Sequence, residues 1–250
     1  MPAFAFLAAS AAARIASLNL CTDEYLLLLA DSRQIASVSY LSQDPQESPL
    51  WRTARAHPGN RGSLEDVITL EPELVLTMGG GGRATALLAR RLHIATLDLP
   101  FATSLTDVER NLRRVAAAIG APRRADPWIA RIERLRVTAP AKARDAIWIS
   151  GSGESLPQDS LGSQWLRLAG LRQRGLPGNR ASLETLLTKP PQVLVQSNYR
   201  SGQMSGGTRW LSHPIVEQAT AIQIMTDGRP WTCMGPLMVR EIERLRGRSQ

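Results

Sequence analysis

Residues 58–76 read PGNRGSLEDVITLEPELVL, and residues 177–195 read PGNRASLETLLTKPPQVLV. The two stretches align without a gap at an offset of 119 residues, and nine of their nineteen positions are identical. Common turn and capping chemistry would explain a shared serine and proline, but not the shared Pro-Gly-Asn-Arg. The repeat therefore predicts an internal duplication, so that the 250 residues form two similar halves.

Each copy of the repeat has the pattern of a turn, a short helix and a strand. Pro-Gly-Asn favours a turn, Ser63 and Ser182 are good N-cap residues, and a later proline ends each helix. The apolar runs 74–76 and 193–195 are typical of strands covered on both faces in a parallel sheet. Each half is therefore predicted to be α/β. Further strands are expected at residues 15–20, 35–38, 94–97, 146–150 and 221–225.

The segment between the halves, residues 101–144, has no strand pattern. Its apolar residues recur at spacings of three and four, which predicts a helix of about four turns; they are Leu105, Val108, Leu112, Val115 and Ile119. The pattern continues helically beyond Gly120. Because a flexible hinge would be rich in glycine and serine, this connector predicts only small relative motion of the halves.

The composition, 43% hydrophobic and 21% charged, is that of a folded protein with a buried core. The longest apolar run, residues 3–13, is shorter than the roughly 20 residues that a membrane-spanning helix needs. The formal net charge is +8, but the arginines are scattered evenly along the chain. That distribution argues against a nucleic-acid-binding patch.

The first residues, 1–13, have the small-residue ending that a signal peptidase accepts, although they lack a basic start. We interpret them as an export-signal remnant that precedes a mature chain beginning near Arg14; the alternative is an ordinary N-terminal helix or strand.

Export would allow Cys21 and Cys233 to pair, but two widely separated cysteines do not make a disulfide framework. We expect two buried free thiols.

The order of these features resembles a known family. The features are residues 14–18 (RIASL), residues 35–40 (IASVSY), the Ser-Leu-Glu helix with residues 71–76 (EPELVL), and the helical connector. Together they are similar to periplasmic substrate-binding proteins that feed ABC importers of iron-siderophores, heme and cobalamin. The resemblance extends over residues 14–245. It implies two Rossmann-like lobes with central parallel sheets, 14–100 and 145–250, joined by one long helix within 101–144, with the ligand held in a cleft between them.

The same resemblance implies a function and partners. A member of this family is an exported, soluble, monomeric, non-enzymatic protein without a cofactor, which delivers a metal chelate or corrinoid to a permease dimer and its ATPase. One exposed glutamate on each lobe docks onto arginine pockets of the permease, and the matching residues here are Glu65 and Glu184. The simpler interpretation of both carboxylates is a favourable interaction with a helix dipole.

Ligand contacts are expected in loops that follow the carboxyl ends of strands. These loops are residues 21–24, 40–51, 78–83, 151–155, 198–209 and 231–233. The residues that we predict to bind the ligand are Tyr40, Trp51, Met78, Arg83, Tyr199, Arg200 and Trp231. The arginines are candidates for anionic groups of a siderophore or propionate, and Tyr40 or His57 for a heme-iron ligand.

Catalytic and protein-bound metal sites have little support in the sequence. The glycine run before Arg83 lacks the Gly-Lys-Ser/Thr ending of a nucleotide loop, and the three histidines are isolated. No Ser, His and acid constellation stands out. The alternatives that remain are a heme-binding transport protein, a binding protein that senses rather than transports, and a two-lobed α/β enzyme acting on a nucleotide-linked substrate.

Overall fold

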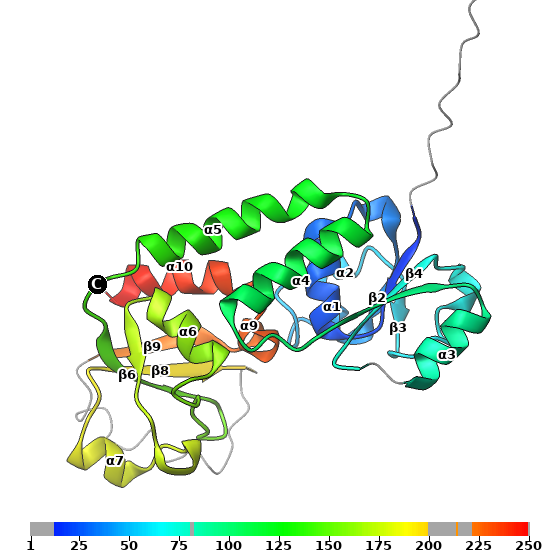
Figure 1. Ribbon diagram of the computed structural model, residues 1–250. Helices are drawn as coiled ribbons and strands as arrows, with labels where there is room; N and C mark the ends of the chain where they lie inside the picture. Colours follow the sequence, from blue (N-terminus) through cyan, green and yellow to red (C-terminus); the bar gives the residue numbers. More distant parts are fainter. Residues whose placement is uncertain (1–12, 81–82, 200–213, 215–221, 250) are drawn as a thin grey trace, which may run out of the picture.

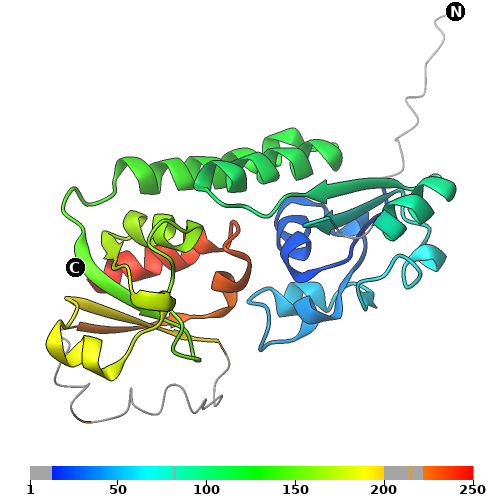
Figure 2. The same ribbon diagram turned by 60° about the horizontal axis from the view of Figure 1, so that its bottom comes forward.

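The computed structural model describes residues 13–80, 83–199, 214 and 222–249. It consists of two α/β lobes, each built around a parallel sheet, with helices that connect them along one side (Figures 1 and 2). The predicted fold class is therefore confirmed. Residues 1–12, which hold nearly all of the predicted export segment, lie outside the described part. Within the described ranges, no helix is both long and apolar enough to cross a membrane.

The first lobe contains a five-stranded sheet with the strand order β3-β2-β1-β4-β5, all parallel. Its strands are β1 (Ile15–Ser17), β2 (Ile35–Ser39), β3 (Gly59–Asn60), β4 (Leu74–Met78) and β5 (Ala95–Leu99). Its helices are α1 (Leu20–Leu29), α2 (Trp51–Ala54) and α3 (Arg83–Arg91), with short 3₁₀ turns η1 (Ser32–Gln34), η2 (Tyr40–Gln43) and η3 (Ile68–Leu70).

The second lobe contains a four-stranded parallel sheet with the order β7-β6-β8-β9. Its strands are β6 (Arg144–Ile149), β7 (Leu171–Gln173), β8 (Val193–Asn198) and β9 (Ile222–Asp227). Its helical elements are α6 (Leu161–Leu168), η5 (Pro177–Asn179), α7 (Leu183–Thr188), α9 (Arg229–Cys233) and α10 (Met238–Ser249).

The sequence repeat occupies equivalent positions in the two sheets. Leu74 of β4 pairs with Ala95 of β5, and Val193 of β8, 119 positions later, pairs with Ile222 of β9. Both repeated strands also lie next to the first strand of their lobe, β1 or β6. The duplicated sequence therefore encodes the same central strand twice, in the same register with its neighbour.

Two local predictions were wrong. The strand predicted at residues 15–20 ends at Ser17, because Asn19 accepts hydrogen bonds from the backbone N–H groups of Cys21 and Thr22 and caps α1. The helix predicted after Ser63 is a turn followed by η3, whereas the equivalent α7 does form behind its Ser182 cap. In the first copy, Ser63 Oγ also accepts the N–H of Asp66, and the Asp66 carboxylate accepts the N–H of Arg61, but the chain continues as a turn.

The connector is a pair of helices rather than the single long helix that the resemblance implies. They are α4 (Leu105–Ala118) and α5 (Asp126–Val137), which run in opposite directions beside each other (Figure 1). Gly120, with a φ of +73°, ends α4, and η4 (Pro122–Ala125) turns the chain into α5. The predicted apolar stripe is confirmed, since Val108, Leu112 and Val115 are fully buried.

One hydrophobic core runs from the first lobe through the connector into the second. It includes Leu26 of α1, Leu112 of α4, Ile132 of α5 and Trp165 of α6, all of them fully buried. A smaller cluster lies on the repeat side of each sheet. Because this core contains residues of both lobes and of the connector, the three parts pack against one another.

The two cysteines form a disulfide, which corrects the expectation of free thiols. Cys21 of the first lobe and Cys233 of the second lie with their Cα atoms 5.3 Å apart, although they are 212 positions apart in sequence. The folded lobes supply the proximity that sequence spacing could not show. In the chain-entropy description, closing so long a loop stabilises the folded state by about 5 kcal/mol.

Candidate ligand-binding site

The carboxyl ends of strands from both lobes face a common pocket of about 380 Å³, here called the central pocket. Cys21 lies in the turn of α1 that follows β1, Met78 ends β4, and Tyr199 follows β8. This is the edge of an open parallel sheet at which small molecules bind. The lining residues are Asn19, Leu20, Cys21, Leu41, Glu47, Met78, Phe101, Tyr199 and Thr232.

A second cavity of about 160 Å³, here called the inner pocket, adjoins the central pocket. The two share Cys21, Met78, Phe101 and Thr232 in their walls. The inner pocket is lined in addition by Tyr25, Ala102, Leu161, Cys233 and Met234. Together the two cavities present a largely apolar surface with a few hydroxyl groups, which is the usual character of a small-molecule site.

Buried hydrogen bonds hold the first-lobe wall in place. Asp23, fully buried in α1, accepts the backbone N–H of Ser39 at 3.0 Å and also its hydroxyl group. Burial raises the pKa of Asp23 to about 7, and the hydrogen bonds from Ser17 and Ser39 partly oppose that rise. These contacts fix the start of α1 against the end of β2, where η2 carries Leu41 into the pocket.

The glycine-rich loop after β4 positions Phe101. Asp98 accepts the Thr77 hydroxyl at 2.7 Å and the Gly80 N–H at 3.0 Å. Gly79 has a φ of +72°, and a Cβ atom placed there would lie 2.1 Å from the Phe101 ring. The absence of a side chain at Gly79 therefore lets the Phe101 ring lie against the loop and line both cavities.

Gly79→Ala is expected to displace Phe101 and weaken ligand binding about tenfold, besides straining the backbone. Gly80→Ala is the matched control, because Gly80 also has a positive φ, +85°, but has nothing within 4 Å of the Cβ position. Ligand titration of both variants checks this expectation. Equal affinities for the two variants would show that the Phe101 contact has no influence on binding.

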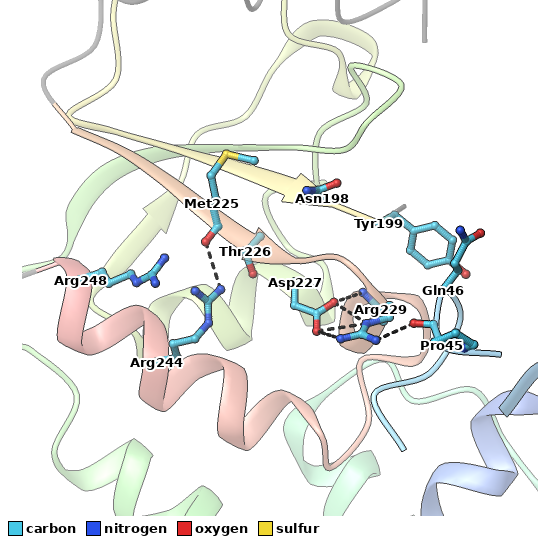
Figure 3. Close-up of a pocket in the computed structure, with 10 residues that line it drawn as sticks. All are labelled: Pro45, Gln46, Asn198, Tyr199, Met225, Thr226, Asp227, Arg229, Arg244 and Arg248. Atoms are coloured by element: carbon cyan, nitrogen blue, oxygen red, sulfur yellow. Dashed lines mark hydrogen bonds and ion pairs between the residues drawn. The ribbon is translucent and has the colours of Figure 1, made fainter. Parts of the chain in front are cut away.

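Two contacts connect the lobes directly beside the central pocket. The Tyr199 hydroxyl of the second lobe donates a hydrogen bond to the Glu47 carboxylate of the first, and Glu47 is itself buried. Arg229 donates to the Pro45 carbonyl oxygen at 2.7 Å while it forms an ion pair with Asp227 (Figure 3). The loop after η2 is therefore attached to the second lobe at two points.

The Arg229 contact lies in a third cavity, of about 420 Å³, here called the arginine pocket (Figure 3). Tyr199 lines both this cavity and the central pocket. Arg244 donates to the Met225 carbonyl oxygen and forms an ion pair with Glu241, so its charge is already balanced by a carboxylate. The remaining lining residues are Pro45, Gln46, Asn198, Thr226, Asp227 and Arg248.

A buried carboxyl group lies where the lobes meet. Glu24 of α1 accepts the backbone N–H of Leu237 at 2.6 Å, and a Cβ atom on Gly235 would lie 2.7 Å from its Oε1. Burial raises the pKa of Glu24 from its ordinary 4.5 to about 8, which the Leu237 hydrogen bond only partly opposes. Glu24 therefore binds a proton in the folded protein at neutral pH.

This shift predicts a pH dependence of stability. Between about pH 4.5 and 8 the unfolded chain loses the Glu24 proton while the folded protein keeps it, so the free energy of unfolding falls as pH rises. The slope is at most about 1.4 kcal/mol per pH unit. Glu24→Gln keeps an acceptor for the Leu237 N–H. It should remove the contribution of Glu24 to the pH dependence of the free energy of unfolding and leave the contribution of Asp23. Urea unfolding of both proteins from pH 5 to 8 tests it, and parallel curves would contradict it.

The structure places two of the predicted ligand residues, Met78 and Tyr199, in the wall of the central pocket. Tyr40 is 55% exposed at the start of η2, and the Trp51 ring has the guanidinium groups of Arg52 and Arg55 over it, 4.6 and 4.7 Å from its centroid. Neither Tyr40 nor Trp51 lines any of the three cavities described above. Their contact with a ligand remains a prediction.

The other predicted residues lie elsewhere. Trp231 is 4% exposed; it packs on Trp148 at 5.2 Å between ring centroids and donates to the Thr226 hydroxyl. Its side chain therefore supports α9 from inside the lobe. The side chain of Arg83 and the whole of Arg200 fall outside the described part of the chain. His57 is buried, outside the three cavities, and burial lowers its pKa.

Glu65 and Glu184 are exposed, one on each lobe. Glu184 lies in the first turn of α7, and Glu65 lies in the corresponding turn before η3. Neither carboxylate forms an ion pair in the described residues. Their positions agree with the docking role that the family resemblance implies, which remains a prediction.

Sequence reasoning named neither Phe101 nor Glu47. Phe101 follows the strand end at Leu99, so its position after a strand was a usable signal that its place in the connector obscured. Glu47 lies in a predicted ligand loop but is marked only by its contact with the other lobe. In the described ranges, no group of three or more His, Cys, Asp or Glu side chains is arranged to hold a metal ion.

The fold is shared with solved proteins of low sequence identity. The periplasmic heme-binding protein HutB of Vibrio cholerae is 18% identical, with a TM-score of 0.73 over 94% of this chain and 98% of its own. The periplasmic heme-binding protein RhuT of Roseiflexus sp. RS-1 is 19% identical, with a TM-score of 0.68 over 94% of this chain and 97% of its own. A periplasmic heme-binding protein from Pseudomonas aeruginosa is 16% identical, with a TM-score of 0.61 over 94% of this chain and 91% of its own.

The family assignment comes from the sequence itself. No curated protein matches the chain significantly. Residues 15–224, however, match the family described as periplasmic binding protein, and that range includes both sheets almost completely. Together with the two parallel sheets and the pocket between the lobes, this match makes the chain a member of the periplasmic binding protein family.

Proposed function

We propose that this chain is the periplasmic solute-binding component of an ABC importer and that it captures heme between its lobes. Its family supports the transport role, and the relatives of the same fold that are named as heme-binding proteins support the ligand. The chain acts by binding rather than by catalysis. Iron-siderophores and cobalamin, the other ligands of the resembled group, are the competing candidates.

The central pocket is the observation that carries this proposal. Leu20, Leu41, Met78 and Phe101 form its apolar first-lobe side. Heme is a flat, mainly apolar macrocycle, and burying its faces against such side chains is favourable at roughly 25 cal/mol per Å². The cavity of about 380 Å³ lies within the range of small-ligand sites, and the inner pocket extends it.

Tyr199 is the described residue best suited to approach the iron. It lines the central pocket, and its hydroxyl group already donates to the Glu47 carboxylate. A tyrosine oxygen is an established type of heme-iron ligand. Tyr40 is the second candidate, since it is exposed on η2 at the same edge of the first lobe.

The anionic edge of heme needs cations near the pocket. Arg83, the first residue of α3, and Arg200 are the sequence-based candidates for its propionates, since each follows a strand in the sequence. On the outer surface, Glu65 and Glu184 are proposed to dock the loaded protein onto the permease dimer, with its ATPase on the far side of the membrane. The protein works as a monomer in the periplasm.

Titration of the purified protein with hemin, cyanocobalamin and a ferric hydroxamate siderophore tests the ligand. We expect saturable binding of hemin alone, seen as a shift of its main absorption band and as quenching of tryptophan fluorescence. Binding of one of the other two ligands without hemin would overturn the heme assignment. A nucleotide sugar is titrated as a fourth compound, and a response to it alone would overturn the transport role as well.

A further inference from the structure

The lobes meet along a short seam below the central pocket. On the first-lobe side the seam consists of the N-terminal half of α1, which carries Cys21 and Glu24. On the second-lobe side it consists of α9 and residues 234–237. The Cys21–Cys233 disulfide and the hydrogen bond from Leu237 to Glu24 both cross it. Figures 1 and 2 show α9 facing α1 at the junction of the lobes.

The disulfide also forms part of the cavity walls. Cys21 lines the central and inner pockets, and Cys233 lines the inner pocket. Both cysteines are partly exposed rather than buried. A small thiol that enters the empty cleft therefore reaches the bond, whereas a ligand that fills the cleft covers it.

The bond supplies a second covalent connection between the lobes. The backbone passes from one sheet to the other only through the connector, from the end of β5 at Leu99 to the start of β6 at Arg144. In Figure 2 the connector helices lie along one side of the molecule, and α9 meets α1 below them. The disulfide therefore adds a covalent restraint on lobe movement beside the pocket, at a place separate from the connector and in addition to the shared core and the hydrogen bonds between the lobes.

We propose that the Cys21–Cys233 disulfide is a redox-sensitive latch of the cleft. When oxidised, it holds the two pocket walls at the spacing that the ligand requires, and thiol reduction releases them so that the cleft opens and the ligand dissociates. The effect on the ligand rests on the proposed function; the effect on the lobes does not. Because the bond joins the lobes beside the pocket, the disulfide contributes to the ligand affinity of the protein as well as to its stability.

The reduction step needs only a dithiol. One thiolate attacks Cys233 Sγ, the Cys21–Cys233 bond breaks, and Cys21 leaves as a thiolate that takes up a proton. The second thiol of the reductant then attacks its own mixed-disulfide sulfur, so that Cys233 is released and the reductant becomes a cyclic disulfide. Two electrons pass from the dithiol to the protein.

Binding and reduction are then linked in both directions. If reduction weakens ligand binding, bound ligand must by the same factor oppose reduction of the disulfide. Cover by the ligand adds a kinetic effect, because it blocks the approach of the thiol to Cys21 and Cys233. A loaded protein thus keeps its latch closed, and an empty one is the form that a reductant opens.

The experiment compares oxidised protein, protein reduced with dithiothreitol, and the Cys21→Ser/Cys233→Ser variant. Without ligand, hydrogen exchange in α1 and α9 should be at least tenfold faster in the reduced protein and in the variant. With hemin, both should bind at least tenfold more weakly than the oxidised protein, and hemin should slow reduction at least tenfold. Dithiothreitol should not affect the variant, which controls for its direct action on hemin.

Circular dichroism of each form checks that both lobes remain folded. Equal exchange and equal hemin affinity in oxidised and fully reduced protein would overturn the latch. If hemin binds to no form, the proposed ligand fails, and the exchange rates of the ligand-free proteins still decide whether the disulfide restrains the lobes. Unchanged exchange in that case would overturn the latch by itself.

Discussion

Replacement of both Glu65 and Glu184 by alanine is expected to abolish uptake of the ligand by cells while leaving its affinity for the purified protein unchanged. The two carboxylates occupy equivalent places in the repeat, one on each lobe, and both are exposed. Removing one partner of a desolvated charge pair at an interface costs about 2–5 kcal/mol. Losing two such pairs would weaken docking by more than about a thousandfold.

The matched control is Glu133→Ala/Glu243→Ala, which changes the net charge equally. Glu133 and Glu243 are also exposed, but they lie on α5 and α10 and pair with Arg136 and Arg131. Uptake of labelled ligand and binding by the purified protein are measured for both double variants. Normal uptake by the Glu65/Glu184 variant, or equal loss in the control, would remove the docking role.

Phe101→Glu is expected to weaken ligand binding about 100-fold, or about 2.8 kcal/mol. Phe101 is 67% exposed in the ligand-free protein, yet its ring lines both the central and the inner pocket. A carboxylate there would lose its hydration when an apolar ligand covers it, which is costly without a partner. Because the side chain is exposed in the free protein, stability should change by no more than about 0.5 kcal/mol.

Val137→Glu is the control for this substitution. Val137 is 70% exposed at the end of α5, away from the three cavities, so it receives the same charge on a comparably open apolar side chain. Ligand titration and urea unfolding of both variants separate a loss of contact from a loss of fold. Unchanged affinity of the Phe101 variant would mean that the ligand binds elsewhere.

Much of the fold follows from the repeat. Its offset of 119 residues predicts two equivalent central strands, and the structure pairs Leu74 and Val193 with equivalent partners. The sequence could not set the exact ends of elements. Whether residues 18–20 extend a strand or begin a helix depends on the hydrogen bonds that the Asn19 side chain accepts, which are an alternative to strand pairing.

The candidate site was predictable as a set of loops, but not residue by residue. The rule that ligands bind beyond the carboxyl ends of parallel strands led to the loops that hold Met78 and Tyr199. It could not tell that the Trp231 side chain points inward, because a tryptophan after a strand is stabilised by packing on a ring such as Trp148 as well as by contact with a ligand.

The disulfide shows what kind of information was missing. Cys21 and Cys233 belong to two of the predicted ligand loops, one in each half, but nothing in the sequence gives the distance between those loops. Their pairing depends on the approach of α9 to α1, which is set by the packing of the lobes on the connector. Distances between lobes are properties of tertiary packing, and no local pattern encodes them.

A crystal structure of the protein with hemin, with the iron located by its anomalous scattering, tests the central claim most directly. We predict one iron atom between the lobes, beside Tyr199, with the macrocycle against Met78 and Phe101 and the Cys21–Cys233 bond intact beneath it. An iron atom on the outer surface of either lobe, with the central pocket empty, would contradict the account.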